Sequence, residues 1–465
     1  MDSLNLKTLE SGIKIVDAAA VDALASGLRG RVLEQGTSAY EEARTIWNAM
    51  VDRHPGLIVR CAGAADVISA VRFARTHELL VAVRGGGHNI AGNAVCDGGL
   101  LIDLSQMKSV RVDLATQRAW VDPGVTLAEL DKETQAFGLA VPTGINSTTG
   151  VAGMTLGGGF GWITRKFGLT VDNLTAADVV TADGNLMRAS AAENQDLFWA
   201  LRGGGGNFGV VTAFEFQLHA LGPQVLAGLV IHPFDDAAKL LKDYRRIVET
   251  TADELTCWVV MRQAPPLPFL PSEWHGREIL VLAMCYSGNI EAGERATAEL
   301  RSLGSPIVDV VEPRAFASWQ AMFDPLLTPG ARNYWKTHDF TELSDGAISV
   351  LTQAIRELPG PECEIFIGHV GGVAGRVPVE ATAFPQRNAH FVMNVHARWR
   401  EPSMDQACIT WPGDSSTLPR RTPPALPTST SCPPMRLTAS RRPMAQTIVD
   451  WRRSSAAMIR PTCSA

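Results

Sequence analysis

Three glycine clusters in the first half of the chain most constrain what this sequence can fold into. They are Gly85–Gly87, Gly157–Gly161 and Gly203–Gly209. The first follows the apolar run Val81–Val83, and His88 comes directly after it. Glycine lets the backbone approach a ligand closely and leaves its N–H groups free to face phosphate. The pattern therefore predicts one large phosphate-bearing ligand, with a histidine within reach of it.

Composition limits the function classes that remain open. The chain has 465 residues, 46% of them hydrophobic and 19% charged, with a net charge of −6. These values are typical of a globular protein of two or three domains and argue against a nucleic-acid partner. No run of apolar residues is long enough for a membrane span, and the N-terminus lacks the apolar core of a signal peptide. We therefore expect a cytoplasmic protein whose eight cysteines are free thiols, with no metal site.

Four short motifs together resemble a known family. They read RGGGHN at 84–89, TTGVAG at 148–153, GGGFG at 157–161 and NFGVV at 207–211. The combination is similar to the covalent-flavin oxidoreductases of the vanillyl-alcohol oxidase and p-cresol methylhydroxylase superfamily, in the berberine-bridge-enzyme-like branch. The resemblance covers about residues 40–410 and is stronger in the first half. It implies an α+β fold, with a two-subdomain FAD-binding domain followed by an α+β substrate domain built on an antiparallel sheet.

Hydrophobic periodicity places elements within this frame. Strands at 57–60 and 80–84 flank a helix at 64–79, which gives a βαβ unit ending in the first glycine cluster. After Pro223, strands such as 255–261 and 391–399 alternate with helices such as 237–249, as in a sheet with helices on one face. We expect a helical lead-in over 1–45, the FAD-binding domain over 46–222 and the substrate domain over 223–411.

The resemblance assigns a role to His88. In the family the matching histidine carries the flavin covalently, through its imidazole to the 8-methyl carbon of the ring system. A neutral imidazole is a competent nucleophile near neutral pH. The alternative is an ordinary turn histidine that only lies near the ligand. The surrounding residues expected to bind FAD are Arg84, Gly85, Gly86, Gly87 and Asn89, although a tight strand-to-helix turn would also use glycines.

The second and third clusters complete the expected FAD site. The stretch 148–161, which includes the second cluster, resembles the family segment that wraps the ribityl and diphosphate groups, and the alternative is a glycine-rich loop packed on the sheet. We interpret the third cluster as a loop on the adenine side of FAD or as a structural loop. The residues expected to contact FAD are Thr148, Thr149, Gly150, Gly153, Gly157, Gly158, Gly161 and Val211.

Asn146 bears on the number of covalent links. Some relatives attach the flavin a second time, through a cysteine in a Gly-x-Cys sequence ahead of the second cluster. Here the sequence is Gly144-Ile145-Asn146, and no cysteine lies between Cys96 and Cys257. We therefore expect a single link. Asn146 either donates a hydrogen bond to the flavin or caps the turn.

The substrate side is less well specified. In the family the second domain lays its sheet over the flavin and supplies polar side chains. Tyr334 and Lys336 alternate with Asn333 and Trp335, so both can face one side of a strand, and either could act as a base. His369 and Arg387 are further candidates. For each of the four, a packed or solvated sheet residue is the alternative.

The resemblance implies a reaction class. The expected activity moves hydride from a C–O or C–N bearing carbon of a small molecule to flavin N5, with molecular oxygen as the acceptor. The alternatives are a flavin dehydrogenase that uses another electron acceptor, and a flavin-binding protein inactivated by its C-terminus. The sequence does not indicate the substrate or the oligomeric state.

The last stretch, 412–465, differs in kind from the rest. It holds nine of the 27 prolines, and eight arginines against two acids, Asp414 and Asp450. Apolar periodicity is lost, as in disordered segments. Back-translated with suitable codons and read two bases further on, 427–435, 443–451 and 456–465 can each give a sequence typical of the family's C-terminus. We therefore interpret this stretch as an out-of-frame tail.

Overall fold

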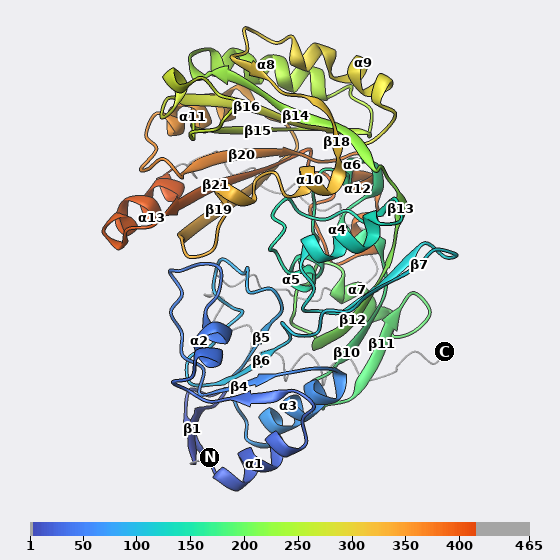
Figure 1. Cartoon of the computed structure of the whole chain (residues 1–465), viewed down its shortest axis with the longest axis vertical. Helices are drawn as coiled ribbons and strands as arrows, with labels where there is room; N and C mark the ends of the chain where they lie inside the picture. The colour runs from blue at the N-terminus through green and yellow to red at the C-terminus, as the bar shows by residue number, and fades with distance from the viewer. Residues whose placement is uncertain (1–2, 415–465) are drawn as a thin grey trace, which may run out of the picture.

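The computed structural model describes residues 3–414, with side chains described through Trp411. Two small sheets lie in the N-terminal half of the molecule, and one large sheet with its helices lies at the opposite end (Figure 1). The fold class predicted from the sequence, an α+β FAD-binding domain of two subdomains followed by an antiparallel substrate domain, is confirmed. The tail expected from 412 overlaps the last described helix, α13 (Asp405–Asp414), and the rest of that tail lies outside the described residues.

The first subdomain is a four-stranded sheet in the order β3-β4-β6-β5. Its strands and main helix are β3 (Arg31–Leu33), β4 (Leu57–Arg60), α3 (Ala64–Thr76), β5 (Val81–Arg84) and β6 (Leu100–Asp103). The predicted βαβ unit is present, but β6 lies between β4 and β5 and pairs parallel with both. β5 is therefore an edge strand, and the first glycine turn follows directly after it.

The N-terminal segment is not purely helical as expected. Besides α1 (Ala18–Ser26) and α2 (Ser38–Arg44), it contains a hairpin of β1 (Leu4–Lys7) and β2 (Ile13–Val16). Strand β3 pairs antiparallel with β4, so this segment contributes a strand to the first sheet. Its strands have four residues or fewer, which is too short for alternation of apolar residues to reveal them.

The second subdomain is a five-stranded sheet in the order β11-β10-β12-β8-β7. All of its strand pairs are antiparallel. Phe214 and Phe216 lie in its core with no exposed surface. Its strands are β7 (Val110–Asp113), β8 (Arg118–Val121), β10 (Leu174–Val180), β11 (Leu186–Ser190) and β12 (Val210–Gln217). Its helices are α4 (Leu127–Gln135), α5 (Val151–Leu156), α6 (Thr164–Phe167) and α7 (Gln195–Leu201), and β9 (Leu139–Ala140) pairs with β13 (His219–Ala220).

The substrate domain is an eight-stranded antiparallel sheet, in which the order runs β17-β14-β16-β15-β20-β21-β19 and β18 pairs with β14. Its strands are β14 (Gln224–Pro233), β15 (Leu255–Gln263), β16 (Glu278–Tyr286), β17 (Val308–Asp309), β18 (Glu312–Ala315), β19 (Arg332–Phe340), β20 (Glu364–His369) and β21 (Phe391–Trp399). Its helices are α8 (Ala237–Val248), α9 (Ile290–Arg301), α10 (Phe316–Gln320), α11 (Asp345–Ile355), α12 (Val373–Arg376) and α13.

The two faces of the large sheet bury different partners. Residues of α8, α9, α11 and α13 pack on one face in a single apolar cluster, which we call the helix-side core. The other face packs on α10 and on Trp162 from the FAD-binding domain. In Figure 1 this second face looks toward the N-terminal half of the molecule. A side chain's position in the pleat therefore decides whether it can reach the FAD-binding domain.

Candidate functional site

The structure brings the first glycine cluster against the motif at 148–153, and the third cluster against the end of α5, where the second cluster begins. A Cβ added to Gly86 would lie 2.5 Å from the Cα of Gly150, and one added to Gly150 would lie 2.7 Å from the Cα of Gly86. Only glycine fits at such an approach. The third turn joins the second, because the amide of Gly205 donates to the carbonyl of Leu156 over 2.9 Å. Residues spread over more than a hundred positions thus form one glycine-lined surface.

The first turn presents free hydrogen-bond donors. Within residues 3–414, the backbone N–H groups of 85–89 donate to no protein acceptor. Gly87 has a φ of +73°, which only glycine adopts at little cost. Successive free N–H groups in such a turn form a site for an anion. The donor set fits the diphosphate of FAD.

Hydrogen bonds fix the tautomer of His88. Asn146 Oδ1 accepts both the amide of Thr148, at 3.1 Å, and the hydroxyl of Thr148, at 2.8 Å. Because the Thr148 hydroxyl donates to Asn146, its oxygen must accept from His88 Nε2, which lies 2.9 Å away. His88 therefore carries its hydrogen on Nε2, and Nδ1 keeps its lone pair. Thr149 Oγ1 lies 3.4 Å from Nδ1.

The surroundings keep His88 neutral. Its ring stacks on Trp47, with centroids 5.0 Å apart and planes 24° from parallel. Trp47 is tied to the same turn, because its amide donates to the Gly87 carbonyl over 3.1 Å. Burial lowers the pKa of His88 to about 4, since a charged ring is poorly solvated there. At neutral pH the side chain is thus an uncharged imidazole whose Nδ1 lone pair accepts from the Thr149 hydroxyl over 3.4 Å.

The other residues expected at the FAD site have different surroundings. Asn146 caps its turn, which is one of the two roles foreseen for it. Arg84 donates to the carbonyls of Glu42 and Ala43 and so ties β5 to α2. Val211 lies in the core of the second subdomain. A Cβ at Gly153 would meet no atom within 4 Å, which leaves open space for a ligand beside α5.

Glycines of the second cluster are needed for packing as well. Gly158 has a φ of +117°, and a Cβ there would overlap the Phe384 ring of the substrate domain. A Cβ at Gly161 would overlap the carbonyl of Thr143, and one at Gly157 would meet a carbonyl of α5 at 3.4 Å. The packed-loop alternative therefore applies to these positions. Asn89 is exposed, and its Oδ1 accepts from the amide of Asn93 over 3.0 Å.

Tyr334 and Lys336 are not brought to His88. Their register partners on β21 are Ala397 and Val395, which belong to the helix-side core, and Tyr334 packs against that core. The Lys336 ammonium lies 5.2 Å from the centre of the Tyr334 ring. Trp335, between them in the sequence, points the other way and contacts Trp47 edge-on at 5.8 Å. Both proposed bases therefore lie on the wrong face of β19 to meet a flavin held at His88.

The two remaining candidates, Arg387 and His369, contact side chains of the FAD-binding domain. Arg387 is buried and pairs through both terminal nitrogens with Asp172, at 2.7 and 2.8 Å. His369 is buried, and its Nε2 accepts from Arg165 Nη1 at 2.8 Å. Burial, with Arg165 beside it, lowers the pKa of His369 well below its usual value. Both side chains thus have structural partners in the FAD-binding domain.

Sequence reasoning missed the aromatic residues around His88. Trp47 and Trp335 lie far from it in sequence, and no local pattern marks either as part of a site. A few absences can be stated for the described part of the chain. Among residues 3–414, no group of three or more His, Cys, Asp or Glu side chains is placed to hold a metal ion, and no helix is long and apolar enough to cross a membrane.

Comparison with known proteins gives a consistent result. Residues 55–190 match a family model described as an FAD binding domain. An FAD-linked oxidoreductase of Dictyostelium discoideum is 32% identical over 390 residues, which cover 82% of each chain. (R)-6-hydroxynicotine oxidase of Paenarthrobacter nicotinovorans is 35% identical over 291 residues, 62% of each chain.

A solved structure shares the fold over most of its length. The crystal structure of 6-hydroxy-D-nicotine oxidase from Arthrobacter nicotinovorans matches with a TM-score of 0.72 at 27% identity, covering 83% of this chain and 86% of that one. The glycine turns, the covering sheet and these relatives agree with one another. The chain belongs to the FAD-linked oxidoreductases of the vanillyl-alcohol oxidase and p-cresol methylhydroxylase superfamily, in the berberine-bridge-enzyme-like group.

Proposed function

We propose that this protein is an FAD-dependent oxidase with the cofactor joined covalently to His88. It would take hydride from a carbon that bears oxygen or nitrogen in a small molecule and use oxygen as the electron acceptor. The observation that carries the proposal is the neutral His88, whose Nδ1 carries no hydrogen, beside a turn whose N–H groups donate to no acceptor within residues 3–414. The similarity to a hydroxynicotine oxidase supports the choice of an oxidase.

Each part of the site has a task in this proposal. The N–H groups of 85–89 would bind the diphosphate, and the close contact between Gly86 and Gly150 would hold the two turns in register around it. The space beside Gly153 would accept another part of the cofactor. When bound, FAD supplies the hydride acceptor at N5 and the route for electrons to oxygen.

His88 would be the attachment residue, acting through Nδ1. Thr148 holds the hydrogen on Nε2, so Nδ1 has a lone pair that can act as a nucleophile once the long hydrogen bond from the Thr149 hydroxyl, 3.4 Å, is broken. FAD, when bound, would supply the electrophilic 8-methyl carbon and the route by which the two electrons released on attachment reach oxygen, and His88 would give up its Nε2 hydrogen as a proton. Within the described residues, Cys96 and Cys257 are buried thiols, and neither lies near Asn146 in the sequence, so we propose a single link.

The substrate would lie against the face of the large sheet that looks toward the FAD-binding domain. Asp339 is on the same face of β19 as Trp335, two pleats further along, and lines a small cavity with Phe160 and Val392. Burial raises the pKa of Asp339, as is useful in a group that must take up a proton. We place the acceptor of the substrate proton there, in place of Tyr334 and Lys336.

Acid precipitation of the purified protein tests the attachment. The expected result is a yellow pellet and an intact mass raised by one FAD, with the modified peptide containing His88. His88→Ala should bind FAD that acid releases completely. A colourless pellet from the unaltered protein would contradict the attachment. Oxygen uptake during turnover separates an oxidase from a dehydrogenase, because a dehydrogenase would reduce an added dye and leave dissolved oxygen unchanged.

A further inference from the structure

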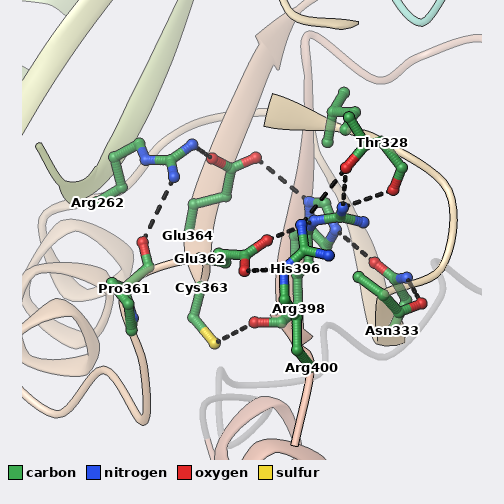
Figure 2. Close-up of polar contacts among 12 residues, drawn as sticks. Arg262, Thr328, Asn333, Pro361, Glu362, Cys363, Glu364, His396, Arg398 and Arg400 are labelled. Carbon is green, nitrogen blue, oxygen red and sulfur yellow. Dashed lines mark hydrogen bonds and ion pairs between the residues drawn. The ribbon is translucent and has the colours of Figure 1, made fainter. Parts of the chain in front are cut away.

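A buried polar chain crosses four strands of the substrate domain, from Arg262 on β15 to Asn333 on β19 (Figure 2). His396 lies at its centre on β21, directly opposite Glu364 on β20 and Trp335 on β19. His396 Nδ1 is 3.2 Å from Glu364 Oε1, and His396 Nε2 is 3.1 Å from Asn333 Oδ1. Glu364 Oε2 accepts from Arg262 Nη1 at 2.6 Å. The imidazole is therefore held at both nitrogens.

The direction of these hydrogen bonds is fixed by their neighbours. Asn333 Nδ2 donates to the Ala331 carbonyl over 2.9 Å, so Asn333 Oδ1 is the atom that faces His396. His396 Nε2 must then carry a hydrogen and donate it. Burial lowers the pKa of His396, while the Glu364 carboxylate beside Nδ1 opposes that lowering. Only 4% of the His396 surface is exposed, so the ring has little freedom to move.

A hydrogen-bonded route leads from His396 to the His88 turn. Asn48 pairs with the backbone of Asn333 in both directions, because its Oδ1 accepts the Asn333 amide at 2.9 Å and its Nδ2 donates to the Asn333 carbonyl at 3.0 Å. Asn48 Nδ2 also donates to the Ile90 carbonyl at 2.9 Å. Ile90 is two residues from His88. The first route thus runs from the substrate sheet to the backbone beside His88.

A second route runs through aromatic rings. Trp335 meets the edge of the His396 ring at 4.4 Å and the edge of Trp47 at 5.8 Å. Trp47 stacks on His88 and is further held by Arg398, whose guanidinium lies 5.3 Å from its ring centre. Edge-to-face contacts of this kind favour particular ring orientations. Both routes begin at His396 and end at His88 or its turn.

We propose that His396 is a positioning residue, which fixes the orientation of the His88 imidazole through the Asn333–Asn48 hydrogen bonds and the Trp335–Trp47 ring contacts. This role deepens the function proposed above and rests on FAD attachment at His88. An attacking atom displaced by about 1 Å can lose roughly a hundredfold in rate. The substrate domain would thereby set the rate at which the FAD-binding domain acquires its cofactor.

The test compares His396→Phe with a matched control, His232→Phe, in the full-length chain. Phenylalanine at 396 keeps a ring against Trp335 but removes both hydrogen bonds. His232 is a buried histidine of the same sheet, 1% exposed, and its ring nitrogens have no partner within residues 3–414. Val230, on the same face of β14, and Leu280, the register partner of His232 on β16, belong to the helix-side core, away from His88. His396→Gln serves as a second variant, since it keeps a donor for Asn333 but loses the ring contact.

Two measurements are made on each variant. The first is the rate at which apoprotein with saturating FAD in air gains acid-stable flavin, alongside the affinity for FAD. The second is the imidazole nitrogen spectrum of the ¹⁵N-histidine-labelled apoprotein, with the His88 signals assigned by their loss in His88→Ala. We expect His396→Phe to slow attachment by roughly ten- to a hundredfold with little change in FAD affinity. Its His88 signals should move from one tautomer toward an average of two, and His232→Phe should resemble the unaltered protein in both.

Each outcome decides the proposal. Attachment rates and His88 signals in His396→Phe that match those of His232→Phe would overturn it. If His396→Phe does not fold, unaltered values in His396→Gln would overturn it in the same way. If the unaltered protein gains no acid-stable flavin, attachment at His88 is refuted, and the nitrogen spectrum alone then decides whether His396 orients His88.

Discussion

Replacing Gly86 with alanine tests whether the contact between the two glycine turns builds the FAD site. The new Cβ would lie 2.5 Å from the Cα of Gly150, whereas ordinary contact begins at 3.4 Å, so the turns must separate by about 0.9 Å or bear the strain. Overpacking of this kind costs about 1–3 kcal/mol. We expect that cost to divide between a lower free energy of unfolding and weaker FAD binding. If the whole cost of about 1–3 kcal/mol falls on FAD binding, the Kd for FAD rises about 5- to 150-fold.

The measurement is best made in a His88→Ala background, where FAD exchanges freely. FAD titration gives the Kd, and urea unfolding of the same apoprotein gives the stability change. Gly360→Ala is the matched control, because a Cβ there meets no atom within 4 Å and the residue has no positive φ. Gly86→Ala and Gly360→Ala proteins with equal Kd and equal unfolding free energy would refute the close-contact reasoning.

Four further predictions follow from the site and its surroundings. Thr148→Val removes the acceptor of the His88 Nε2 hydrogen, worth about 1 kcal/mol, and should slow flavin attachment about fivefold, whereas Thr149→Val should not slow it. Because the pKa of His88 is about 4, attachment in air should be independent of pH above about pH 5 and should decline below it with a one-proton slope; a midpoint near pH 6.5 would contradict its burial. Burial, partly opposed by Gln320, raises the pKa of Asp131 to about 7, so the folded carboxyl keeps a proton that the unfolded one releases near pH 3.8. Stability should therefore fall as pH rises from about 4 to 7, and Asp131→Asn should flatten that slope in urea unfolding at each pH. Finally, restoring the reading frame after Trp411 should raise flavin content and oxygen uptake, and a resequenced gene that encodes the same tail in an equally active, monodisperse protein would contradict the frameshift hypothesis.

The sequence predicted those features of the fold and site that depend on a few residues close together in the chain. The glycine turns were visible because Gly86 and Gly150 must be glycine for their backbones to meet, and the strands around them because their apolar runs are buried. The choice of Tyr334 and Lys336 shows the limit. Alternation along β19 correctly grouped them on one face, but both faces of this sheet are covered. Hydrophobicity then gives no sign of which face meets the flavin.

Contacts between distant segments account for the rest of what the sequence could not show. Trp47 reaches His88 across 41 positions, and Asn48 reaches Asn333 across 285. Neither Trp47 nor Asn48 lies in a repeat, a glycine cluster or a periodic stretch. The strands β4 and β5 were expected as neighbours, yet β6 lies between them, because pairing order depends on the whole sheet.

The two domains hold opposite sides of the same small region, and this arrangement bears on how attachment is controlled. The turn that carries Asn146 and Thr148 is anchored from the substrate domain, because the Ser147 amide donates to Asp324 Oδ1 over 2.9 Å. The first turn is anchored by Asn48, which is itself paired with β19. A shift of the large sheet relative to the FAD-binding domain would therefore move Thr148 through the Ser147–Asp324 contact. It would move the backbone beside His88 through Asn48. If the cofactor is attached at His88 as proposed, attack by Nδ1 depends on both the hydrogen bond that His88 Nε2 donates to Thr148 and the ring stack on Trp47. Attachment should then proceed only once the two domains have docked. Covalent flavin would then report correct docking of the domains.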